Sequence, residues 1–277
     1  MGGSRVGGID FAVLGRGERN VRKSGLFLGT GILLVAAISM GGDLGADEIM
    51  DRVRSNRASR TAKATIRMTL IDAHRRKLGK EFVVWREIMG GSSRTLIRFK
   101  NPPDVRGTSF LVLQESGKEE RTYVKFPESP KLQLITSSQR KDSFMGSDFS
   151  YGDFRIEEKG EDVFKLIGSE SIKGIDCHII QSTPKNLEDA QYSKVILWVD
   201  KKKFVAQKTE FYDKKGNTKK RLVVNEVKLI ENTWTATHST MTDLSENHQT
   251  ILEILEVTFK VEFPPDFFTR RTLMRGM

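Results

Sequence analysis

The sequence has 277 residues, of which 38% are apolar and 30% are charged, and this composition excludes a disordered chain. Lysine and arginine outnumber aspartate and glutamate by 46 to 36, giving a formal net charge of +10 at pH 7, but both signs are interspersed along the chain. No helix-turn-helix, zinc or RNP-like pattern accompanies the charge, so the sequence does not predict a nucleic-acid partner.

The first 46 residues have the pattern of a secretory signal. A basic region between positions 16 and 23 precedes an uncharged apolar stretch from Leu26 to Ile38, which is shorter than the roughly 20 residues that span a bilayer. Small residues follow, and we expect cleavage after Ala46, with Gly41 as the other candidate. The long basic region leaves two alternatives open, an uncleaved anchor and a misplaced start codon.

Cys177 is the only cysteine, which excludes an intramolecular disulfide. No cysteine follows the expected cleavage site, so we expect no lipid anchor and a periplasmic location. Cys177 lies in an apolar stretch beside His178, and neighbouring strand residues point to opposite faces of a sheet. We therefore predict an inert, buried thiol. With residues 1–46 removed, residues 47–277 are expected to form one domain.

Hydrophobic periodicity predicts a fold that is mainly β with a few helices (α+β). Apolar residues three and four apart predict a short helix from Asp47 to Arg57, and one helical turn is expected after Pro264. Residues 62–70 alternate between apolar and polar side chains, as in a half-buried strand. Further strands are expected at 82–88, 95–99, 107–113, 121–126, 163–167, 175–181, 193–199, 204–212, 219–230, 233–242 and 250–261. Consecutive strands with few helices predict an antiparallel meander.

Residues 128–155 lose this alternation but carry large apolar groups. We call residues 144–154 the lid segment, because they contain five such side chains in a stretch without strand periodicity: Phe144, Met145, Phe149, Tyr151 and Phe154. Two interpretations remain open. The five side chains either fill the core of a closed barrel or cover the mouth of a sheet that does not close.

Sequence signatures of enzymes are missing. There is no G-x-S-x-G elbow, P-loop or H-E-x-x-H motif, and the four histidines are scattered. Asp148 and Asp153 could form a carboxylate pair, but capping and turn roles explain both residues more simply. A metal site from His238 and His248 is a weaker alternative. We predict no catalytic residue, no metal site and no cofactor.

Several motifs in this order resemble bacterial outer-membrane lipoprotein-sorting proteins related to the Lol carrier. The resemblance covers about residues 46–275 and rests on Ala46–Met50, Gly107–Leu111, the run Phe144–Tyr151, Thr183–Lys185, Trp198–Asp200, Glu210–Asp213 and Phe268–Thr269. It implies a curved antiparallel half-barrel of about eleven strands covered by a helical lid. It also implies a monomeric periplasmic carrier of lipid or lipoprotein cargo, with an inner-membrane exporter as a further partner. An alternative is a ligand-sensing or adaptor protein for such an exporter.

An apolar cavity suits this role, because exposing an acyl chain to water costs about 0.8 kcal/mol per CH2. We expect the lid segment to be a weakly packed cover whose movement opens the cavity. The periodicity does not tell which sheet face is concave. The residues we expect to line the cavity are Ile66, Met68, Leu70, Phe82, Leu96, Val195, Leu197, Leu255 and Val257.

Overall fold

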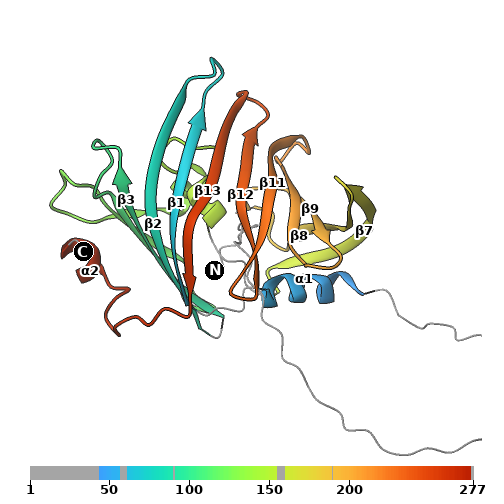
Figure 1. Ribbon diagram of the computed structural model, residues 1–277, viewed down its shortest axis with the longest axis horizontal. Helices are drawn as coiled ribbons and strands as arrows, with labels where there is room; N and C mark the ends of the chain where they lie inside the picture. The colour runs from blue at the N-terminus through green and yellow to red at the C-terminus, as the bar shows by residue number, and fades with distance from the viewer. Residues whose placement is uncertain (1–43, 57–60, 90, 155–159, 189, 276–277) are drawn as a thin grey trace, which may run out of the picture.

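A computed structural model describes residues 44–56, 61–89, 91–154, 160–188 and 190–275 of the chain (Figure 1). The expected signal peptide therefore lies almost wholly outside the described residues. Within them, strands dominate and form one curved antiparallel sheet. The open shape, with a concave and a convex face, confirms the predicted half-barrel, but the sheet has 13 strands among the described residues where about eleven were expected.

The described elements follow the predicted order closely. The helices are α1 (Ala46–Ser55), the short 3-10 helices η1 (Ser137–Lys141) and η2 (Tyr151–Phe154), and α2 (Arg270–Arg275). The strands are β1 (Thr61–Ile71), β2 (Lys77–Met89), β3 (Ser92–Asn101), β4 (Ser109–Gln114), β5 (Arg121–Lys125), β6 (Gln133–Ile135), β7 (Asp162–Ile172), β8 (Ile175–Pro184), β9 (Lys194–Asp200), β10 (Ala206–Tyr212), β11 (Thr218–Ile230), β12 (Thr233–Asp243) and β13 (His248–Phe259).

The sheet order differs from a single meander. It is β6-β5-β4-β3-β2-β1-β13-β12-β11-β10-β9-β8-β7, so two meanders join where the first strand pairs with the last. That junction is long, running from Ala62 opposite Phe259 to Ile71 opposite Gln249. The two free edges, β6 and β7, are consecutive in the chain. The segment that connects them, which includes η1, η2 and the lid segment, therefore has to cross the open side of the half-barrel.

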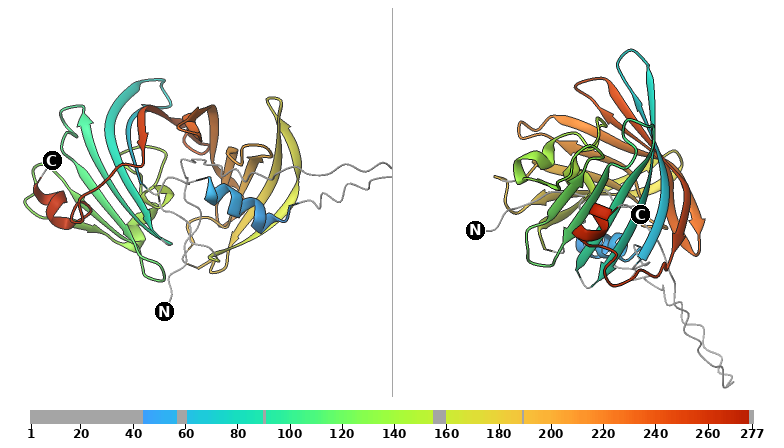
Figure 2. Two further views of the ribbon diagram at one scale, coloured as in Figure 1. Left: turned by 60° about the horizontal axis from the view of Figure 1, so that its bottom comes forward. Right: turned by 90° about the vertical axis from the view of Figure 1, so that its left-hand side faces the viewer.

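The sheet buries apolar side chains on both faces. On the concave face a large core runs from β1–β4 to β9–β13 and includes the lid segment. Helix α1 covers the same face near β7–β9, where Ile49, Met50 and Val53 contact Phe164 and Val199. On the convex face the chain after β13 returns over β2–β5 and ends in α2 (Figure 2, left). Helices thus cover both sides of a sheet that does not close.

One pair of neighbouring strands is only partly joined. The ladder between β12 and β13 runs from Asp243 opposite His248 to His238 opposite Glu253 and ends there among the described residues. Beyond it, β12 continues to pair with β11, and β13 continues to pair with β1. The lower halves of β12 and β13 accordingly diverge (Figure 1). We call this divergence, between residues 233–237 and 254–259, the seam.

Candidate ligand-binding cavity

An apolar cavity lies on the concave face, centred on β1, β2 and β13. Its walls come from β1, β2, β3, β12, β13 and η2, and the residues that line it are Ala62, Ala64, Ile66, Phe82, Val84, Arg86, Ile88, Thr95, Ile97, Phe154, Thr235, Leu252, Ile254, Val257 and Phe259. The free volume is about 70 Å³. Typical small-molecule sites measure roughly 300–1,000 Å³, so a large ligand would have to push the walls apart.

The cavity wall has one cationic side chain, Arg86 of β2. Burial lowers the pKa of this guanidinium to about 10, because the surrounding apolar groups disfavour its charged form. A pKa near 10 still leaves Arg86 protonated at neutral pH. The cavity is therefore an apolar space with a positive charge in its wall, between the cross-strand neighbours Ala62 and Thr95.

The lid segment packs into the concave core. Phe144 and Phe149 are each 1% exposed. The Phe144 ring lies 4.5 Å from the ring of Phe154 and 5.1 Å from that of Phe110, measured between centroids. Aromatic pairs at such spacings add about 0.5–1.5 kcal/mol beyond the area they bury. This packing differs from the weak cover expected from the sequence, since Phe144 and Phe149 are buried as deeply as the sheet core.

A tight turn shapes the tip of the lid segment. Ser147 donates its backbone N–H to the carbonyl of Phe144 at 3.0 Å. The two central residues, Met145 and Gly146, have positive φ angles of 53° and 76°. This is the conformation of a two-residue hairpin turn, in which glycine is favoured because it lacks a Cβ atom. Lys80 of β2 donates to the carbonyl of Met145 at 2.5 Å and so fixes the turn to the sheet.

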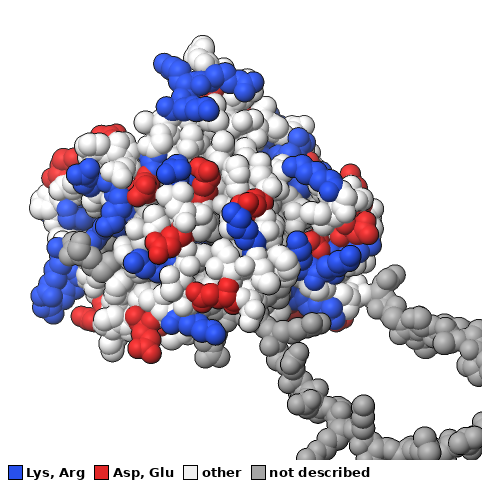
Figure 3. Space-filling model, in the orientation of Figure 1, with Lys and Arg blue, Asp and Glu red and all other residues white. Residues whose placement is uncertain are grey.

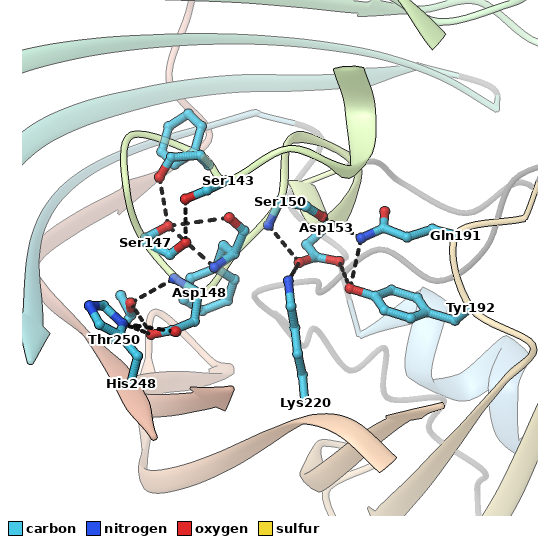
Figure 4. Close-up of polar contacts among 12 residues, drawn as sticks. Ser143, Ser147, Asp148, Ser150, Asp153, Gln191, Tyr192, Lys220, His248 and Thr250 are labelled. Atoms are coloured by element: carbon cyan, nitrogen blue, oxygen red, sulfur yellow. Dashed lines mark hydrogen bonds and ion pairs between the residues drawn. The ribbon is translucent and has the colours of Figure 1, made fainter. Parts of the chain in front are cut away.

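Asp148 fastens the lid segment to β13 (Figure 4). The Thr250 hydroxyl donates to the Asp148 carboxylate at 2.6 Å, and the Asp148 amide donates to the same hydroxyl at 2.9 Å. Nδ1 of His248 lies 2.9 Å from the carboxylate. Because hydrogen bonds to charged groups contribute about 1.5–3 kcal/mol each, this cluster opposes movement of the lid segment.

Asp153 makes a second fastening, to β11 and to the residues before β9 (Figure 4). Its fully buried carboxylate accepts hydrogen bonds from the Ser150 amide at 2.7 Å and from the Tyr192 hydroxyl at 2.9 Å. Lys220 Nζ lies 3.6 Å from the same carboxylate. Burial first, and the nearby Asp153 charge second, raise the pKa of Tyr192 well above its usual value, so the phenol remains a hydrogen-bond donor.

The structure brings most of the expected cavity residues together. Ile66, Phe82 and Val257 line the cavity. Met68, Leu70, Val195 and Leu197 belong to the same concave core, as do all five apolar residues of the lid segment.

Two expected residues lie elsewhere. Leu96 is on the convex face, where it packs against Phe268 and Leu273 of the chain that follows β13. The strand alternates, so its neighbours Thr95 and Ile97 face the cavity instead. Leu255 is 44% exposed, because the register between β1 and β13 shifts beside it and β13 bulges. Placing these two residues in the cavity was therefore wrong.

Sequence reasoning missed several wall residues. Ala62, Ala64 and Val84 share the face of Ile66 and Phe82, and the alternation of β1 could have identified the first two. Thr235 gave no comparable signal, because β12 carries threonine or serine at several positions of the same face, including Thr233, Thr237 and Ser239.

The described residues include no group of three or more His, Cys, Asp or Glu side chains placed to hold a metal ion. No helix among them has the length and hydropathy needed to cross a membrane. The face shown in Figure 3 carries Lys, Arg, Asp and Glu side chains that are intermingled, rather than one broad patch of a single sign.

Comparisons with known proteins agree with this geometry. The sequence matches the model of a family of uncharacterized proteins over residues 91–275, more than half of the chain. The chain belongs to this family. A DUF1329 family protein from Desulfovibrio piger has a similar structure, with 26% identity and a TM-score of 0.79, covering 82% of this chain and 97% of that one. No curated protein matches the sequence.

Two further solved structures are similar to this chain. An outer-membrane lipoprotein-sorting protein domain from Vibrio parahaemolyticus is 25% identical, with a TM-score of 0.77, and the match covers 83% of this chain and 98% of the domain. A LolA superfamily protein from Nitrosomonas europaea is 19% identical, with a TM-score of 0.68 over 83% and 99% of the two chains. This chain therefore has a LolA-like fold.

Proposed function

We propose that this protein is a non-catalytic periplasmic carrier that holds the acyl chains of a lipid or lipoprotein in the concave cavity. The observation that carries the proposal is the cavity itself, whose walls are almost entirely aliphatic and aromatic and lie under a covering segment rather than in a closed barrel. A lipoprotein-sorting protein domain shares this fold at 25% identity, which supports the same class of cargo.

The size of the cavity indicates how cargo would be held. About 70 Å³ of free space cannot accept a long acyl chain without movement of the walls. Each CH2 removed from water contributes about 0.8 kcal/mol, so a long chain provides enough free energy to drive such a movement. A cavity that stays small without cargo also exposes little apolar surface to water, which suits a soluble carrier.

Filling the cavity tests the proposal. Ala64 lines it, and Ala64→Leu adds three carbon atoms to the free space. We expect the free energy of unfolding to rise by about 1–2 kcal/mol, because cavity filling stabilises a core. Titration with cis-parinaric acid, a fluorescent fatty acid, is expected to show at least fivefold weaker binding. Opposite signs for stability and binding are specific to a ligand cavity.

The matched control is Lys63→Leu, which adds a leucine at the neighbouring, exposed position of β1. We expect this variant to bind cis-parinaric acid like the wild type. Unchanged binding by Ala64→Leu, or no saturable binding by the wild-type protein, would contradict a carrier that uses this cavity.

A further inference from the structure

The seam between β12 and β13 lies beside the cavity. On one side, Thr235 of β12 lines the cavity, and on the other Ile254 and Val257 of β13 do so. Each strand stays paired with its other neighbour here, since Thr235 pairs with Lys228 of β11 and Val257 pairs with Ala64 of β1. Ladder pairing between β12 and β13 has ended at His238 and Glu253. The cavity wall at this point therefore consists of two strand edges that do not pair with each other.

Exposed leucines lie on both flanks of the seam. Leu255, at the bulge of β13, is 44% exposed, and Leu229 of β11, opposite Trp234 of β12, is 54% exposed. Single exposed leucines are common on protein surfaces. Here, however, they lie on either side of the seam, whose inner side is lined by apolar groups of the cavity. An alkyl chain that enters the seam would contact apolar side chains both outside and inside the wall.

The lid segment offers a less favourable route. To move, it would have to break the buried hydrogen bonds of Asp148 with Thr250 and of Asp153 with Tyr192, and it would have to withdraw Phe149 from the core. Widening the seam breaks no ladder hydrogen bond between β12 and β13, because none joins the two strands beyond His238 and Glu253 in the part of the chain that the structure describes. Separating buried polar groups from their hydrogen-bond partners therefore costs more free energy than separating two strands that share no ladder hydrogen bond.

We propose that the seam is the passage through which a linear alkyl chain enters and leaves the cavity, while the lid segment stays closed. The cargo head group remains outside the wall. This inference rests on the proposed carrier function. It adds the route that the cargo takes and the requirement that the part of the cargo passing through the seam is a linear chain. It also explains why the cavity can remain small without cargo, since separating the two strands enlarges it from one side.

Closing the seam with a disulfide tests the route. Continued by one residue, the register of the ladder would bring Thr237 opposite Ile254, and both are replaced by cysteine in a Cys177→Ser background. In an antiparallel pair, opposite residues lie within disulfide reach when the strands approach. Stopped-flow mixing with cis-parinaric acid compares the oxidised and reduced forms of the same variant. We expect oxidation to slow loading at least tenfold and reduction to restore it.

The control pair is Thr240→Cys with Ile251→Cys, which already face each other in the ladder. Its oxidation is expected to change loading by less than twofold. If the disulfide at 237 and 254 does not form, a short bis-maleimide bridges the same two thiols and replaces the oxidised arm. Equal loading rates with the seam bridged and free would overturn the passage. Absence of saturable binding in the reduced form and the wild type would contradict the carrier function, and the passage with it.

Discussion

The Asp148 carboxylate of the lid segment accepts a 2.6 Å hydrogen bond from the hydroxyl of Thr250, near the start of β13. The two residues are 102 positions apart in the sequence. Thr250 is fully buried, so this contact links the segment that crosses the open side of the half-barrel to the strand that joins its two meanders. The lid segment is thus fixed at the centre of the sheet.

Asp148→Ala is expected to lower the free energy of unfolding by about 2–4 kcal/mol, because it leaves the buried Thr250 hydroxyl without its charged acceptor. Urea denaturation followed by tryptophan fluorescence measures the change. Asp142→Ala, at an exposed position just before the lid segment, is the control and is expected to cost less than about 0.5 kcal/mol. Equal losses for the two variants would show that the Asp148 contact contributes nothing.

Phe149 and Phe154 are expected to respond differently to truncation. Phe149 is buried in the core, so Phe149→Ala is expected to destabilise the protein by about 3–5 kcal/mol. Phe154 is only partly buried and lines the cavity, so Phe154→Ala is expected to cost less and to enlarge the space available to cargo. Thermal melting and cis-parinaric acid titration are measured on both. Weaker binding by Phe154→Ala would contradict the expectation that added space in the cavity favours cargo.

Leu96 and Ile97 are neighbours on β3 that face opposite sides of the sheet. Leu96→Ala is expected to cost about 2–5 kcal/mol of stability, since Leu96 is fully buried against the chain after β13, but to leave ligand affinity unchanged. Ile97→Ala is expected to change both stability and affinity, because Ile97 lines the cavity. Loss of affinity in folded Leu96→Ala protein would mean that cargo also contacts the convex face.

Cys177 is expected to resist alkylation in the folded protein. Its side chain is fully buried, and burial raises the pKa of the thiol to about 11. Because the pKa of the thiol is higher in the folded than in the unfolded protein, its contribution to the free energy of unfolding is fully present below about pH 9. The contribution is lost between about pH 9 and 11. Iodoacetamide labelling at pH 8, with and without urea, is the measurement. Labelling as fast in the native as in the unfolded protein would contradict an inert thiol.

The local pattern predicted the strands well, and the long-range pairing much less. Alternation between residues 62 and 70 placed β1 within one residue at each end. Strand β6 was missed, because its three residues lie in a stretch without alternation. Pairing of β1 with β13 joins residues nearly 200 positions apart, and no local signal encodes such a contact. The predicted single meander was therefore incomplete.

The candidate site was predicted in part for a related reason. Period-two alternation groups Ile66, Met68 and Leu70 on one face, but it does not say whether that face is concave. Leu96 faces the convex side and Leu255 lies at a β-bulge. Neither feature can be recognised from the pattern of apolar and polar residues, so both leucines were placed in the cavity. The seam could not be predicted at all, since strand periodicity continues through residues 233–237 and 254–259 after their mutual pairing has ended.

The lipid content of the protein is the most direct test of the carrier function. The wild-type chain and Ala64→Leu are purified side by side from periplasmic extracts without detergent, extracted with organic solvent and analysed by mass spectrometry. The account predicts a stoichiometric amount of an acyl-chain-bearing molecule with the wild type and a clear reduction with Ala64→Leu. Lipid no higher than in a blank extract, or equal amounts in the two proteins, would contradict it.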